Sequence, residues 1–112
     1  MNFEALTRMA EMEASLLLGG LPPELHSQVE ELPVFFEAFP GADDVASGIA
    51  EDTLGFYEVE PVPRIRLWLE NIWDYAGADE AVFQEEVRTT LLHEIGHHFG
   101  WDEDEVADRG LE

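Results

Sequence analysis

The sequence predicts an α+β fold in one domain that spans residues 1–112. Two kinds of pattern carry this prediction: helical hydrophobic spacing near both ends of the chain, and short aromatic-rich or alternating runs between them. A chain of 112 residues, of which 46% are hydrophobic, is long enough to bury one core and too apolar for a disordered segment. We therefore expect about three helices and about three strands.

The first helix is predicted over residues 3–18, and a shorter helix follows it. Asn2 can cap the start of the first helix, and Gly19-Gly20 is a typical stop. Pro22-Pro23 then opens the second helix, which ends at Pro33. The apolar residues that recur at helical spacing are Phe3, Leu6, Met9 or Ala10, Leu16 and Leu17 in the first helix, and Leu25, Val29 and Leu32 in the second.

Strands are predicted over residues 34–39, 54–60 and 64–70. The first run is rich in aromatic residues, and the third alternates between two faces. Residues 41–53 between the first and second strands are small and acidic without a period, and they are predicted to form a loop. The two faces of the third strand are Ile65, Leu67 and Leu69 on one side, and Arg64, Arg66, Trp68 and Glu70 on the other.

Two arginines of the third strand have a structural explanation. If the second and third strands pair antiparallel, Arg64 and Arg66 lie near Glu58 and Glu60. We prefer this charge match across the strands to an anion-binding site.

The longest helical pattern covers residues 79 to about 99. Acidic residues at its start complement the helix dipole, and Gly100 is a natural stop. An apolar residue at every fourth position gives this helix one buried stripe. The stripe consists of Phe83, Val87, Leu91, Ile95 and Phe99.

The charge balance narrows the classes of partner. Five Arg and no Lys stand against 26 Asp and Glu, which gives a net charge of −21. Such a chain is repelled by the phosphates of nucleic acids and by anionic membranes, so neither is expected as a partner. Divalent cations and basic partners are favoured, although general solubility is the simpler explanation of the acidity and the one that we prefer.

The chain contains no cysteine, which excludes disulfides, thiolate metal ligands and thiol nucleophiles. No apolar run approaches the ~18 residues that cross a bilayer. The first 20 residues contain three Glu before a short Leu run, unlike a secretory signal. A cytoplasmic location is therefore expected.

Three of the four histidines lie in the segment HEIGHH, residues 93–98. On a helix, His93 and His97 lie on one face, about one turn or ~6 Å apart, so both imidazoles can reach one ion. Glu94 lies beside this face, offset from it, where it can contact a water on the metal. The spacing therefore predicts two imidazole ligands of a zinc ion and one carboxylate general base. The alternative is a histidine-bearing helix surface that binds no metal.

A third ligand is required because two imidazoles hold zinc weakly. Gly100 allows the chain to turn back after the helix, which returns Glu103 to the metal face. Asp102 and Asp104 are close in the sequence and stay open as alternatives. Glu103 is the preferred candidate.

Several neighbouring residues have less specific roles. We expect His98 to be partly buried near Leu91 and Ile95, with a hydrogen bond to Glu94 or to the backbone. Thr90 and Glu86 lie on the metal face before His93, either as residues that orient an imidazole or as plain surface positions. A donor to a developing oxyanion is expected from one of three residues: Tyr57, Tyr75 or His98.

The segment HEIGHHFGWDE, residues 93–103, resembles the HExxHxxGxxH/D signature of metzincin-like zincins. Together with EEVRTTLL at residues 85–92, it resembles more closely the small bacterial zincin-like metallopeptidase family. This resemblance implies a minimal zincin fold in which a small mixed sheet packs on the helix that carries the motif. It places Glu103 where the family usually has Asp or His.

The sequence therefore predicts a zinc metallopeptidase that holds one Zn²⁺ ion through His93, His97 and Glu103, with Glu94 as the general base. Its partner is a peptide or protein substrate, for which the acidity favours basic sequences. The alternative is a catalytically weak or inactive, metal-stabilised module that binds another protein. An acidic decoy for a nucleic-acid-binding protein would leave the histidine spacing unexplained.

Overall fold

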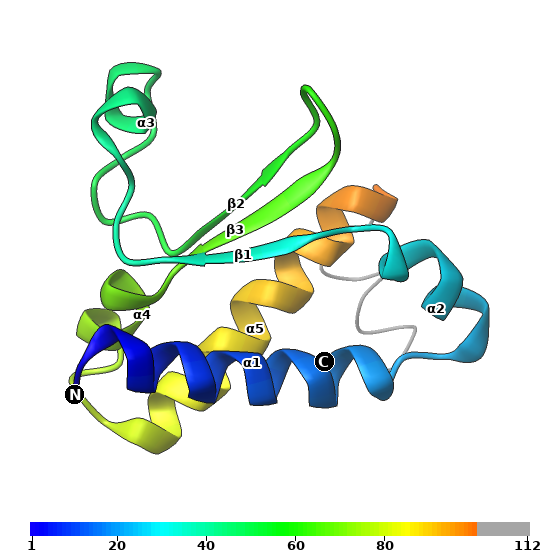
Figure 1. Cartoon of the computed structure of the whole chain (residues 1–112), viewed down its shortest axis with the longest axis horizontal. Helices are drawn as coiled ribbons and strands as arrows, with labels where there is room; N and C mark the ends of the chain where they lie inside the picture. The colour runs from blue at the N-terminus through cyan, green and yellow to red at the C-terminus, as the bar shows by residue number, and fades with distance from the viewer. Residues whose placement is uncertain (101–112) are drawn as a thin grey trace.

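The structure is a computed structural model, and it describes residues 1–100. It confirms the α+β class, with helices and strands mixed along the chain (Figure 1). In chain order the elements are α1 (Phe3–Gly19), α2 (Pro23–Glu30), β1 (Val34–Glu37), α3 (Ala42–Ala46), β2 (Gly55–Glu58), β3 (Arg64–Trp68), α4 (Leu69–Tyr75) and α5 (Glu80–Phe99).

The three strands form one mixed sheet in the order β1-β3-β2. The central strand β3 pairs parallel with β1, with Val34 opposite Ile65. It pairs antiparallel with β2, with Gly55 opposite Leu67. The expected mixed sheet is therefore present, and β1 and β2 are its two edges.

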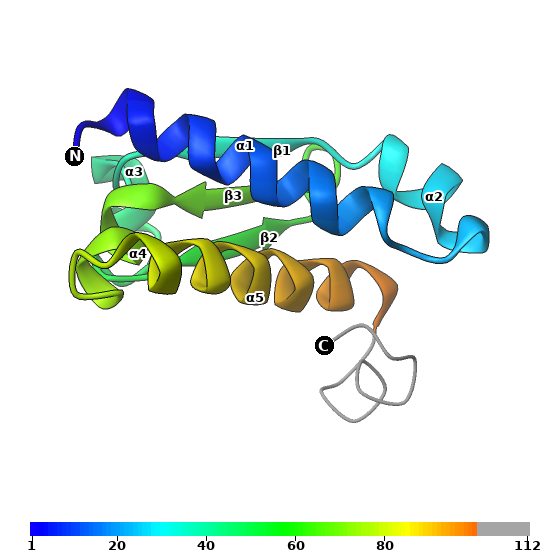
Figure 2. The same cartoon turned by 90° about the horizontal axis from the view of Figure 1, so that it is seen from below.

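One face of the sheet is covered by helices and carries the core. Figure 2 shows α1 and α5 running along this face, with α4 at one end. Ile65 and Leu67 of β3 point into this layer and are fully buried. They pack in one cluster with apolar residues from α1, α4 and α5, among them Leu6, Ile72, Phe83 and Leu91. Burial of this cluster is the main source of stability, because apolar area is removed from water on all sides.

Both ends of the first helix and the start of the second were predicted closely, whereas the second helix ends at Glu30, three residues before Pro33. The Asn2 side chain accepts a hydrogen bond of 2.9 Å from the backbone N–H of Ala5, which caps α1. The second helix begins at Pro23, where the prolines predicted a start. The predicted strands are present but shorter than expected, by two or three residues each.

Two predictions about loops and strand ends were wrong. Residues 41–53 were expected to be a loop, but they contain the short helix α3. The Asp44 carboxylate accepts a hydrogen bond of 2.8 Å from the Gly41 N–H, which closes the first turn of this helix. The third strand was expected to run to residue 70, but the chain enters α4 at Leu69. Leu69 and Ile72 lie three residues apart on one helical face, and both are fully buried.

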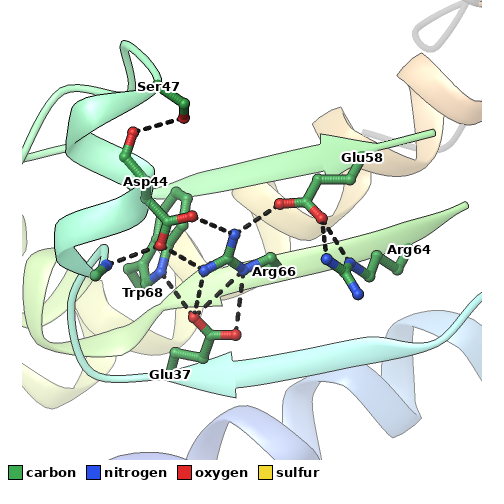
Figure 3. A network of polar contacts seen from close by, with 8 residues as sticks. Glu37, Asp44, Ser47, Glu58, Arg64, Arg66 and Trp68 are labelled. Carbon is green, nitrogen blue, oxygen red and sulfur yellow. Dashed lines mark hydrogen bonds and ion pairs between the residues drawn. The ribbon is translucent and has the colours of Figure 1, made fainter. Parts of the chain in front are cut away.

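The outer face of the sheet, opposite α1 and α5, is organised around Arg66 (Figure 3). Its guanidinium forms ion pairs with Glu37 of β1 at 2.8 Å, with Asp44 of α3 at 2.6 Å and with Glu58 of β2 at 2.6 Å. The Trp68 indole N–H donates to Glu37 at 3.1 Å. This cluster therefore ties β1, α3 and β2 to the central strand.

The predicted charge match across β2 and β3 is correct for one of its two carboxylates. Glu58 lies opposite Arg64 and binds both Arg64 and Arg66. Glu60 lies in the turn after β2 ends at Glu58, and Glu37 and Asp44 supply the other two carboxylates around Arg66. Both come from parts of the chain that the strand pattern did not connect to Arg66.

The ion pairs shift the pKa values of the groups that take part. The hydrogen bond from Arg66 lowers the pKa of the Asp44 carboxyl. For Glu58, burial acts in the opposite direction, but the hydrogen bonds from Arg66 and Arg64 outweigh it and lower the pKa. Hydrogen bonds to Asp44 and Glu37 raise the pKa of Arg66, so its guanidinium stays charged.

Across residues 1–100, no helix combines the length and the apolar composition that a membrane crossing requires.

Candidate metal centre

The helix α5 carries the motif and is fixed at both ends. At its start, the Asp79 side chain accepts a hydrogen bond of 3.0 Å from the Val82 N–H. At its end, Gly100 adopts the left-handed conformation with φ 73°. Four residues of the predicted stripe are buried in the core: Phe83, Val87, Leu91 and Ile95. The helix predicted over residues 79–99 is therefore confirmed to within one residue, and its apolar side is anchored.

His93 and His97 lie next to each other on the opposite, solvent-facing side of α5. Both residues are exposed. Their ring centroids are 4.9 Å apart, with an angle of 63° between the ring planes. The two imidazoles are thus close enough to reach one ion from the same helix face, which is the arrangement that the spacing predicts.

Glu94 is buried beside this pair, with only 7% of its surface exposed. One carboxylate oxygen lies 3.1 Å from Nδ1 of His97. Burial raises the pKa of Glu94, and the charge of a protonated His93 acts against that shift. The sequence placed Glu94 at the side of the metal face, and the structure adds that the carboxylate is largely shielded from solvent.

The residues present fit part of a zinc site. Two imidazoles on one solvent-facing helix surface match the preference of Zn²⁺ for histidine nitrogen. Within residues 1–100, no group of three or more His, Asp or Glu side chains is placed to hold a metal ion. Glu103 and its alternatives Asp102 and Asp104 lie outside the described residues, so the third ligand stays a prediction.

His98 is partly buried, as expected, but its partner is different. The hydroxyl of Tyr57 in β2 lies 2.8 Å from Nδ1 of His98, and the two rings meet edge to face at 5.5 Å. The sequence pointed to Glu94 or the backbone because helical spacing reveals only local partners. Tyr57 is 41 residues away, and the sheet brings it to this helix.

The structure also separates the three candidate oxyanion donors. Tyr57 and His98 are in contact with each other, and His98 directly follows His97 on α5. Tyr75 ends α4 and lies before the first turn of α5. His93 is 13 residues beyond Glu80, about 20 Å along the helix axis. Tyr75 is therefore too far away to act at this site.

Sequence reasoning missed one residue near the site, Gly55 of β2. A Cβ atom at this position would lie 2.7 Å from Cγ2 of Thr90, which is closer than real Cβ contacts allow. Thr90 is buried, at 9% exposure, and packs against this strand rather than facing solvent. The available signal was a glycine at the start of a predicted strand, which often marks a close approach of another element.

Comparison with known proteins agrees with this geometry. A family model described as zincin-like metallopeptidase matches residues 47–111, which is more than half of the chain and includes the whole motif. A comparison with curated proteins finds no relative that matches. The match over residues 47–111, with the paired histidines of α5 inside it, shows that the chain belongs to the zincin-like metallopeptidase family.

Proposed function

We propose that the protein is a zinc-dependent metallopeptidase in which Glu94 acts as the general base of amide hydrolysis. The observation that carries this proposal is the placement of a shielded carboxylate against one of two adjacent, solvent-facing imidazoles. Membership of the metallopeptidase family supports it.

His93 and His97 would hold the ion through ring nitrogens, and Glu103 would add a carboxylate oxygen. Because Nδ1 of His97 lies against Glu94, Nε2 is the nitrogen of this ring that remains for the metal. A bound zinc ion supplies a Lewis acid that polarises a carbonyl and lowers the pKa of water toward about 7.

Glu94 would take a proton from the attacking water and pass it to the leaving amine. Its burial suits this role, because a carboxylate that is costly to keep charged is a stronger base. The contact with His97 keeps the carboxylate next to the site where the water is activated. Tyr57 or His98 would donate a hydrogen bond to the developing oxyanion.

The sheet also suggests where a peptide substrate lies. β2 is an edge strand that packs against α5, whereas β1 forms the opposite edge. Within residues 1–100 no strand pairs with the outer edge of β2, so an extended peptide can add to it through backbone hydrogen bonds. Because β2 is the edge strand that packs against the helix of the motif, we assign this role to β2.

The test is the substitution Glu94→Gln, with Glu85→Gln as the matched control. Glu85 is an exposed glutamate on the same helix. We expect Glu94→Gln to abolish hydrolysis of fluorescein-labelled casein by the zinc-loaded protein while zinc content and thermal stability are retained. Glu85→Gln should behave as wild type. Hydrolysis that survives Glu94→Gln would overturn the proposed mechanism, and a zinc-loaded wild type without hydrolysis would favour the metal-stabilised binding module.

A further inference from the structure

We infer that β2 forms a cover over Glu94, and that Gly55 and Tyr57 hold this cover in place as positioning residues. The role of Glu94 as general base rests on the proposed function. The cover is a property of the fold and can be tested without metal or substrate.

Three residues of α5 form a stripe along the side of the helix that faces β2. Thr90, Glu94 and His98 follow one another at intervals of four, so they lie on one helical side. The first and the last member of the stripe both meet β2, through Gly55 and Tyr57. Glu94 lies between them and therefore faces the same strand. This explains why Glu94 is 7% exposed while its neighbour His93 is solvent-facing.

Gly55 allows β2 to approach α5 closely. Besides the 2.7 Å to Thr90 Cγ2, a Cβ here would lie 3.0 Å from Leu67 Cδ2 and 3.3 Å from the Arg66 carbonyl oxygen. Leu67 can move its flexible end, but Thr90 is β-branched and stiff on its helix. A side chain at position 55 would therefore push the strand away from α5.

Tyr57 fastens the other end of the same strand segment. Gly55 and Tyr57 are two residues apart in β2, so both point to the face that meets α5. The Tyr57 hydroxyl reaches Nδ1 of His98 at 2.8 Å. On the outer face, Glu58 binds Arg64 and Arg66, which holds β2 to the central strand. The strand is thus fixed from both faces above Glu94.

The cover has a consequence for the proposed chemistry. It shields the carboxylate from water on the β2 side and leaves the side toward His97 as the route of approach. A loosened strand would let water reach Glu94 from the β2 side as well.

Because the chain contains no cysteine, a single introduced thiol can report on the cover. In Glu94→Cys the thiol replaces the covered carboxylate, and in Thr89→Cys it stands at an exposed position of the same helix. The reaction with 5,5′-dithiobis(2-nitrobenzoic acid) is followed on the metal-free, full-length protein. Each rate is divided by the rate of the same variant in urea, which corrects for intrinsic reactivity.

We expect the corrected rate of Glu94→Cys to be at least about tenfold lower than that of Thr89→Cys, because reactivity follows exposure. Adding Gly55→Ala or Tyr57→Phe should each raise the rate at position 94 several-fold and leave the rate at position 89 unchanged. Tyr57→Phe removes only the hydroxyl, so it provides a mild second variant if Gly55→Ala disturbs the fold.

The rescue variant distinguishes positioning from general destabilisation. Thr90→Ser removes Cγ2, the atom that a Cβ at position 55 would meet most closely. Gly55→Ala with Thr90→Ser should therefore restore slow labelling at position 94. In a protein that keeps Glu94, Gly55→Ala alone should lower kcat/KM for casein hydrolysis. Gly55→Ala combined with Thr90→Ser should restore kcat/KM, and zinc affinity should be unchanged in both variants.

Two results would overturn the cover: equal corrected rates at positions 94 and 89 in the parent protein, or rates at position 94 that neither Gly55→Ala nor Tyr57→Phe changes. Neither result depends on zinc or on hydrolysis. The outcome of Glu94→Gln in the casein assay is independent of both, so each proposal can fail alone.

Discussion

The Glu94 carboxylate lies 3.1 Å from Nδ1 of His97, so the proposed base and a proposed zinc ligand are in direct contact on one helix. The carboxylate fixes the orientation of this imidazole, in the way that acidic partners orient metal-binding histidines elsewhere. The ring of His93 stands 4.9 Å from that of His97 on the same face. The two proposed ligands and the proposed base therefore lie side by side on α5.

Loss of either motif histidine should remove most of the zinc affinity. We expect His93→Ala and His97→Ala each to weaken zinc binding by more than about 100-fold, because one imidazole and one carboxylate cannot complete a site. Competition with a chromophoric chelator measures the affinity. His26→Ala, at the histidine of α2, is the control and should bind zinc as wild type does. A full equivalent of tightly bound zinc in His97→Ala would contradict the assignment.

The third ligand can be identified by comparing neighbouring acidic residues. We expect Glu103→Ala to lower zinc affinity strongly, because it removes one of three protein ligands. Asp102→Ala and Asp104→Ala should leave it almost unchanged and serve as matched controls. If one of these two variants loses the metal and Glu103→Ala does not, that aspartate is the ligand. Equal affinity in all three variants would place the third ligand elsewhere.

Acid should destabilise the protein through the Arg66 cluster. The pKa values of Asp44 and Glu58 are lowered in the folded state, whereas in the unfolded chain such carboxyls titrate near about 4. The stability that they contribute is therefore present above about pH 5 and is lost as pH falls through the unfolded and then the folded pKa values. Urea unfolding between pH 7 and pH 3 measures this loss.

Arg66→Gln tests the cause of the acid effect. We expect it to lower the free energy of unfolding at pH 7 by about 2 kcal/mol, because it leaves Glu37 and Asp44 without their cation and Glu58 with Arg64 alone. The dependence of stability on pH between 5 and 3 should become weaker. Arg8→Gln removes an exposed pair with Glu4 and is the control that should change neither quantity. An unchanged pH dependence in Arg66→Gln would show that other groups cause the acid sensitivity.

The stability of the fold should depend on the buried side of α5 and much less on its exposed side. Leu91 is fully buried on the core side of the helix. We expect Leu91→Ala to cost about 3 kcal/mol of stability, since it opens a cavity in the core. Thr89→Ala, at an exposed position two residues earlier, should stay within about 0.5 kcal/mol of wild type. Thermal or urea unfolding checks both, and an equal effect of the two variants would contradict this placement of the core.

The sequence predicted the parts of the site that depend on local spacing. The helix of the motif, its stop at Gly100 and the shared face of His93 and His97 all follow from residues close together in the chain. Local patterns also carried the family resemblance, which the family match confirms. The metal and the catalytic roles of these residues stay predictions.

The sequence could not predict the contacts that join distant segments. The partners of Arg66 in β1 and α3 are 29 and 22 residues away, and the partner of His98 is 41 residues away. No periodic pattern links such positions. The short helix α3 was missed for the same reason, since Asp44 is held partly by Arg66. The helix α4 was missed because Leu69 continues the alternation of the preceding strand as well as it begins a helical face.

The mixed pairing of the sheet also has a kinetic consequence. Arg64 and Glu58, which join β2 to β3, are six residues apart, whereas Arg66 and Glu37, which join β3 to β1, are 29 residues apart. Closing the larger loop costs more chain entropy, and this cost comes before the contacts that offset it have formed. The antiparallel hairpin should therefore form early during folding, and the parallel strand should dock late, once the hairpin already offers it an edge.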